Sequence, residues 1–157
     1  MADLKPPQRT GDERGTVLSL LQFQRESFLR KVEGLDDAAA RSSPVASGTS
    51  LLWLTRHLAF AESVWVLGRF AGRPQDVPPY EVPDGDSVGV AVEAYRATWR
   101  AVDEVVAGAS FDDVCDVGGE RSAVDLRWIM AHLLEETARH AGHADILREL
   151  LDGSTGR

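Results

Sequence analysis

The chain has 157 residues and a mass of 17.1 kDa, with 43% hydrophobic and 27% charged residues, which indicates one globular domain and excludes a disordered chain. Its formal net charge of -8 argues against nucleic acid as a partner, because phosphate binding requires a basic surface. Cys115 is the only cysteine, so an internal disulfide and a thiolate metal cluster are both excluded. No segment has the length and apolarity of a membrane span, and we expect a soluble, cytoplasmic protein with no membrane partner.

The first half of the chain predicts two helices. Residues 1–11 contain two prolines and few apolar side chains, so we expect a flexible N-terminal arm. Apolar residues then recur at helical spacing over residues 12–34, which predicts the first helix. Thr49 or Ser50 is suited to cap a second helix, because a hydroxyl oxygen can accept a bond from a free amide of the first turn. This helix is expected to end near Phe70.

A long connection and a third helix follow. Residues 71–85 contain four prolines and two glycines, a composition that sustains neither a helix nor an interior strand. Residues 88–107 are rich in alanine and valine and predict the third helix. Residues 108–119 form a second irregular connection. Both connections are long enough for a crossover between helices.

The fourth helix is the longest. Ser122 and Asp125 have the spacing of a capping box, which places the start of the helix near Ser122, and the apolar pattern continues to about Leu151. No segment shows the alternating pattern of a half-buried strand. The sequence therefore predicts an all-α, four-helix bundle over residues 12–153, with a C-terminal tail over 154–157 and long connections between helices two and three and between helices three and four.

The fourth helix carries three of the four histidines of the chain. Glu136 and His140 lie four residues apart and project from one helix face, so they can chelate a metal ion, and His57 from a neighbouring helix could complete a three-residue site. Spacing alone leaves other pairs open: His132 with Glu136, and His140 with His143. It also allows a solvated polar face with intrahelical ion pairs and no metal.

Aromatic residues and the cysteine suggest weaker possibilities. Trp53, Trp65, Trp99 and Trp128 stand at apolar helix positions, which favours core and pocket walls over a dedicated binding motif. Exposed tryptophans and the proline-rich arm are compatible with a homodimer. Cys115 has no basic neighbour in the sequence to lower its pKa, and we expect an inert thiol.

Two segments, PVASGTSLLWLTRHLA (44–59) and LRWIMAHLLEETARHAGHADILRE (126–149), resemble the DinB/YfiT-like superfamily. They are most similar to its actinobacterial branch, which is related to mycothiol-dependent maleylpyruvate isomerases. The resemblance covers nearly the whole chain and implies a four-helix bundle that binds zinc or nickel through one histidine of helix two and two residues four apart on helix four. Carried over to this sequence, those ligands are His57, Glu136 and His140, with Glu136 where many relatives have histidine.

The resemblance selects one ligand set among those that spacing allows. Two imidazoles and one carboxylate suit zinc, nickel, iron or manganese, and zinc is the metal we expect. His143 occupies a place where relatives often carry glutamine. The resemblance thus implies that three further residues line the pocket or orient the ligands: His132, His143 and Trp53.

The implied function is a metal-dependent enzyme that activates the thiol of mycothiol, or of another small thiol, for S-transfer to an electrophilic substrate or for isomerisation. The catalytic residues are not identified; the candidates are Glu135, His143 and Arg139. Two alternatives are a non-catalytic stress protein that binds a metal or a small ligand, and a hydrolase in which Glu135 or His143 acts as general base on water. Arg56, Arg127 and Arg139 could hold substrate carboxylates, although surface ion pairs are the favoured interpretation.

Overall fold

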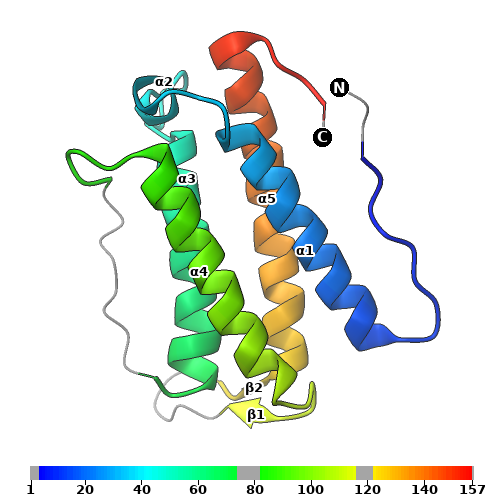
Figure 1. Cartoon of the computed structure of the whole chain (residues 1–157). Helices are drawn as coiled ribbons and strands as arrows, with labels where there is room; N and C mark the ends of the chain where they lie inside the picture. The colour runs from blue at the N-terminus through cyan, green and yellow to red at the C-terminus, as the bar shows by residue number, and fades with distance from the viewer. Residues whose placement is uncertain (1–3, 74–81, 116–121, 157) are drawn as a thin grey trace.

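The computed structural model describes residues 4–73, 82–115 and 122–156. Its long helical segments pack side by side in one bundle (Figure 1). The segments are α1 (Glu13–Val32), α3 (Leu51–Glu62) with the π-helix η1 (Ser63–Phe70) as its continuation, α4 (Val88–Ala107) and α5 (Leu126–Asp152). A short helix, α2 (Asp37–Arg41), lies between α1 and α3. The predicted all-α fold is confirmed.

The bundle has a crossover topology. In Figure 1, α1 and α5 run in one direction, and α3 and α4 run together in the other. The end of η1 and the start of α4 therefore lie at opposite ends of the bundle, and the proline-rich connection between them joins these ends. Residues 74–81 of that connection and residues 116–121 of the next one lie outside the described part of the chain.

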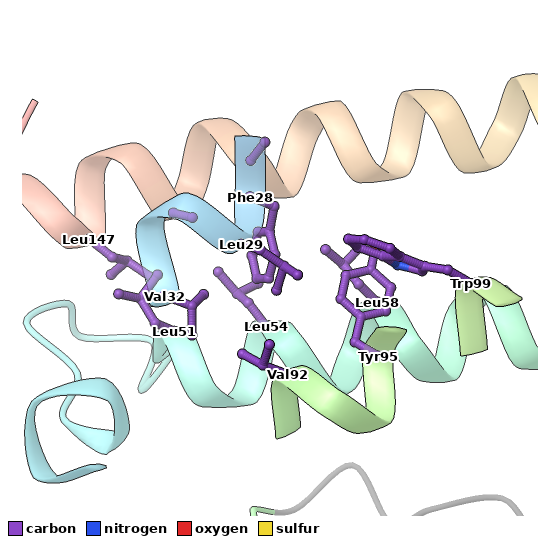
Figure 2. Close-up of a cluster of buried hydrophobic side chains, with 12 residues drawn as sticks. Phe28, Leu29, Val32, Leu51, Leu54, Leu58, Val92, Tyr95, Trp99 and Leu147 are labelled. Atoms are coloured by element: carbon purple, nitrogen blue, oxygen red, sulfur yellow. The ribbon is translucent and has the colours of Figure 1, made fainter. Parts of the chain in front are cut away.

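Two clusters of buried side chains form the core, one near each end of the bundle, and every long helical segment contributes to both. Figure 2 shows the cluster near the α2 end. Complete burial of each such leucine, valine or phenylalanine side chain is worth about 1.5–3 kcal/mol. The main members of the cluster in Figure 2 are Phe28, Leu29 and Val32 of α1, Leu51, Leu54 and Leu58 of α3, Val92, Tyr95 and Trp99 of α4, and Leu147 of α5. This cluster packs α3 against the C-terminal half of α5.

The start of α5 differs from the predicted capping box. The carboxylate of Asp125 accepts a hydrogen bond from the backbone amide of Trp128 at 2.7 Å, so Asp125 and not Ser122 is the N-cap. Two short strands, β1 (Val114–Cys115) and β2 (Val124–Asp125), pair antiparallel just before the helix. The sequence did not predict them, because two residues are too few to show an alternating pattern.

This difference gives a test by substitution. Asp125→Ala should lower the free energy of unfolding by about 1 kcal/mol, because the first turn of α5 loses its side-chain acceptor. Ser122→Ala should change it by less than about 0.5 kcal/mol, since the Ser122 side chain does not cap the helix. Urea denaturation of the two variants measures both values, and equal losses would contradict the assigned cap.

The second predicted helix is present, but its last two turns are wound as a π-helix. The amide of Ala71 donates to the carbonyl of Val66 at 2.9 Å, five residues earlier. A π-helix of this length is rare, and π turns occur often at functional sites. Hydrophobic spacing did not distinguish it from an α-helix. Its winding sets the directions of Trp65 and Arg69.

A buried ion pair stands where α3 becomes η1. Arg25 of α1, only 1% exposed, donates from Nε to Oε1 of the fully buried Glu62 at 2.9 Å. The hydroxyl of Tyr95 donates to the same carboxylate at 3.2 Å, and Arg25 also pairs with Asp103 at 3.0 Å. Burial alone would lower the pKa of Arg25, but the two carboxylates outweigh burial and raise it above its ordinary value. This network ties α1, α3 and α4 together.

Within the described part of the chain, no helix combines the length and the apolarity that crossing a membrane requires.

Candidate metal centre

Three predicted ligands meet between α3 and α5. Glu136 and His140 lie one turn apart on α5, and His57 approaches from α3. Nε2 of His57 and Nε2 of His140 are each 3.0 Å from the same oxygen, Oε1 of Glu136. The ligand atoms of all three residues lie within 4.8 Å of one another. The core packing of α3 against α5 brings together residues that are 79 positions apart in the sequence.

Two neighbouring side chains hold the imidazole rings. Trp53, one turn before His57 on α3, stacks on that ring with centroids 5.0 Å apart and planes within 5° of parallel. Nδ1 of His143 lies 3.2 Å from Nδ1 of His140, so one of these nitrogens donates to the other. Trp53 therefore restricts rotation of His57, and His143 restricts rotation of His140. The predicted roles of Trp53 and His143 as pocket residues remain predictions.

His132 has different neighbours. Its ring stacks on Trp128 at 5.1 Å and meets the edge of Trp65 at 4.9 Å. Its Nδ1 is 4.0 Å from Glu135, at the limit of an ion pair. The structure thus places His132 in an aromatic cluster beside the three converging residues, and its predicted role at the metal remains a prediction.

The charge states of Glu136 and His140 suit a cation. Burial tends to raise the pKa of Glu136, but hydrogen bonds and charge from His57 and His140 outweigh burial and lower it. Burial and the neighbouring His57 lower the pKa of His140, and they outweigh the opposite effect of Glu136. A carboxylate and a neutral imidazole are therefore favoured near pH 7, and these are the forms that coordinate metals.

The hydrogen-bond partners of the two imidazoles indicate which ring nitrogens carry hydrogens. The ionised Glu136 oxygen can only accept, so the two Nε2 atoms carry hydrogens in this arrangement. Coordination would need the Nε2 lone pairs and hence hydrogens on Nδ1. His140 has His143 as a partner for such a hydrogen, whereas Nδ1 of His57 is buried without a hydrogen-bond partner. The donor set fits a metal ion, and His143 supports one of its two imidazoles.

The remaining sequence candidates lie outside this cluster. Glu135 and Arg139 are exposed and pair with each other at 3.5 Å. Arg56 pairs with the buried carboxylate of Asp86. Arg127 has three carboxylates within 3.6 Å, which belong to Glu13, Asp112 and Asp125. The favoured interpretation of these arginines as ion-pair partners agrees with their contacts, and the catalytic roles of Glu135 and Arg139 remain predictions.

Two hollows have residues of α5 in their linings. One, of about 360 Å³, has mostly apolar walls that include Val45, Ile146 and Leu147, and His143 forms part of its lining. The other, of about 640 Å³, lies between η1 and the start of α5, with Phe60, Trp65 and Trp128 in its walls. Both volumes are in the range of small-molecule sites. The sequence analysis identified the tryptophans as walls but not the hollow they form.

The fold and sequence have known relatives. The structure is similar to a conserved protein from Enterococcus faecalis, with a TM-score of 0.67 and 15% identity over 92% of this chain and 100% of that one. It is also similar to a DinB-like protein from Bacillus cereus, with a TM-score of 0.69 and 18% identity over 85% of this chain and 89% of that one. At these identities the likeness shows the fold alone, and no protein of curated function matches the chain. Residues 16–153 match the mycothiol-S-transferase family, so the chain belongs to that family and its DinB/YfiT-like relationship is confirmed.

Proposed function

We propose that this protein is a divalent-metal-dependent transferase that joins the sulfur of mycothiol, or of another low-molecular-weight thiol, to an electrophilic substrate. The convergence of His57, Glu136 and His140 within 4.8 Å carries the proposal. Membership of the mycothiol-S-transferase family supports the class of co-substrate. Thiol-dependent isomerisation would begin with the same addition of sulfur to carbon.

The proposed metal ligands are His57, Glu136 and His140, and the proposed metal is zinc. Two neutral imidazoles and one carboxylate leave open coordination positions, as in catalytic zinc sites. When bound, the cation would lower the pKa of a thiol and stabilise its thiolate near neutral pH. With one carboxylate and one bound divalent ion, the site has a net positive charge of one and attracts a thiolate.

The surrounding residues position the ligands. Trp53 stacks on His57 and excludes water from one face of that ring. His143 offers His140 an acceptor for the Nδ1 hydrogen that coordination through Nε2 requires. In S-transfer, the carbon–sulfur bond forms, the leaving group departs with its bonding electron pair, and the thiol proton passes to solvent.

His143 gives a prediction separate from the ligands. His143→Ala should weaken zinc binding by about tenfold, because His140 loses the partner that fixes its tautomer, whereas the fold should be unchanged since His143 is exposed. Competition with a chromophoric chelator measures the affinity. His143→Gln should recover much of it, since an amide oxygen also accepts from Nδ1. An unchanged affinity in His143→Ala would show that this contact does not support the metal.

The function is tested with purified protein, zinc, mycothiol and a general electrophile such as monochlorobimane. Elemental analysis should find about one metal ion per chain, and mass spectrometry should find the thiol conjugate. Conversion of a thiol-independent ester substrate, without any conjugate, would favour the hydrolase. Bound metal without conjugate, isomerisation or hydrolysis would favour the non-catalytic binding protein.

A further inference from the structure

The larger of the two hollows has the features of a substrate site. It holds about 640 Å³ between η1 and the start of α5, and we call it the tryptophan pocket after Trp65 and Trp128 in its walls. Phe60, one turn beyond His57 on α3, also lines it. On α5, His132 stacks on Trp128 and stands one turn before Glu136. The lining of the pocket therefore begins about one helical turn from His57 on α3 and about two turns from Glu136 on α5.

The walls favour a planar apolar ligand. The rings of Trp65 and Trp128 lie 5.3 Å apart at 52°, and Trp128 is 46% exposed. His132 backs Trp128 in a nearly parallel stack, which holds the indole in place without covering its other face. Large aromatic surfaces gain free energy by stacking with a further ring and by removing their area from water. An aromatic group of the ligand would stack on these rings and would also remove their exposed area from water.

The pocket also offers a positive charge. The guanidinium of Arg69 lies 4.8 Å from the centroid of Trp65, and its terminal nitrogen donates to the carbonyl of Ser122 at 2.6 Å. Its Nε atom is buried without a hydrogen-bond partner. Among the residues that the structure describes, no carboxylate lies within 4.0 Å of Arg69, in contrast to the paired Arg56 and Arg127. A planar guanidinium binds carboxylates with good geometry.

We infer that the tryptophan pocket binds the electrophile and selects aromatic electrophiles that carry a carboxylate. The ring would lie against Trp65 and Trp128, the carboxylate would accept from Arg69, and the reactive carbon would face the ligands of the metal. That the ligand is an electrophile rests on the proposed transferase function. The preference for an aromatic carboxylate rests on the pocket alone.

An aryl chloride shows the balanced reaction. With 4-chloro-3-nitrobenzoate, the thiolate sulfur adds to the carbon that bears chlorine, the carbon–sulfur bond forms and the carbon–chlorine bond breaks. Chloride leaves with the bonding pair, and the thiol proton goes to solvent. No oxidant or further reactant is needed.

Binding is tested first, without chemistry. Isothermal titration calorimetry of the zinc-loaded full chain compares 4-nitrobenzoate with uncharged 4-nitrobenzamide. We expect the benzoate to bind about tenfold more tightly, a difference of about 1.4 kcal/mol, because its carboxylate can accept a charge-assisted hydrogen bond. Arg69→Gln should abolish that preference, and Trp128→Ala, at an exposed position, should weaken both ligands about fivefold. Arg100→Gln, at an exposed arginine of α4, is the matched control and should change neither.

Catalysis then separates the two proposals. If both hold, mycothiol conjugates of 4-chloro-3-nitrobenzoate form with a lower KM than those of its amide, and Arg69→Gln removes the difference. Equal binding and equal KM for the two compounds, in a protein that does form conjugates, would overturn the inference and leave the transferase standing. Carboxylate-selective binding without any conjugate would contradict the transferase while supporting the ligand class of the pocket.

Discussion

Replacing Glu136 by glutamine is expected to reduce zinc from about one ion per chain to well below one and to lower kcat/KM for thiol transfer by about a thousandfold. The amide keeps the size of the side chain but removes the only negative charge among the three converging residues. Loss of several kcal/mol of electrostatic stabilisation corresponds to a rate change of this size. Elemental analysis and conjugation kinetics measure the two effects.

The control for this variant is Glu149→Gln, which changes an exposed carboxylate on the same helix. It should keep both metal and activity. Circular dichroism should show an unchanged helix content in Glu136→Gln, because Glu136 is only partly buried. Stoichiometric zinc in a His57→Ala, His140→Ala double variant would refute the proposed ligand set.

The second large effect concerns stability. Glu62→Gln is expected to lower the free energy of unfolding by about 3–5 kcal/mol, because the buried Arg25 would lose its buried carboxylate partner and keep only the largely exposed Asp103. For a chain of this length, such a loss corresponds to a decrease of about 10 °C in Tm. Differential scanning calorimetry measures the change in Tm. The loss is assigned to the Arg25–Glu62 pair because the two side chains form a bidentate contact.

Two comparisons isolate the cause. Replacing both partners, as Arg25→Met with Glu62→Leu, should recover most of the loss, because no buried charge remains. Replacing Glu93 in the exposed Arg100–Glu93 pair should change the free energy of unfolding little, because solvent screens that pair. A loss in Glu62→Gln that is no larger than the loss at Glu93 would show that the buried pair contributes little.

The position of this ion pair also bears on the proposed substrate site. Glu62 is the last residue of α3, and η1 begins at the next position. Arg25 and Tyr95 hold its carboxylate from α1 and α4. The transition from α to π winding therefore begins at a residue fixed by three helices. Since η1 carries Trp65 and Arg69, the same contacts set where the walls of the tryptophan pocket stand.

Much of the fold was predictable because it depends on local patterns. Helical periodicity located the four long helices, and the predicted end of the last one near Leu151 agrees with Gly153, which ends α5 with a φ of 75°. The spacing of Glu136 and His140 also fixed their common face, since four residues complete about one turn. The β1–β2 pair and the winding of η1 were missed, because neither leaves a periodic signal in so few residues.

The sequence by itself determined the all-α class, the possible chelating pairs on α5 and the family of the chain. Only the tertiary structure decided which turn of α5 faces His57, because that depends on packing between residues 79 positions apart. It likewise placed His132 among tryptophans and brought Arg25 to Glu62. Local spacing is a property of one helix. Which residue of another helix a side chain meets depends on how the helices pack, and burial of the two core clusters fixes that packing.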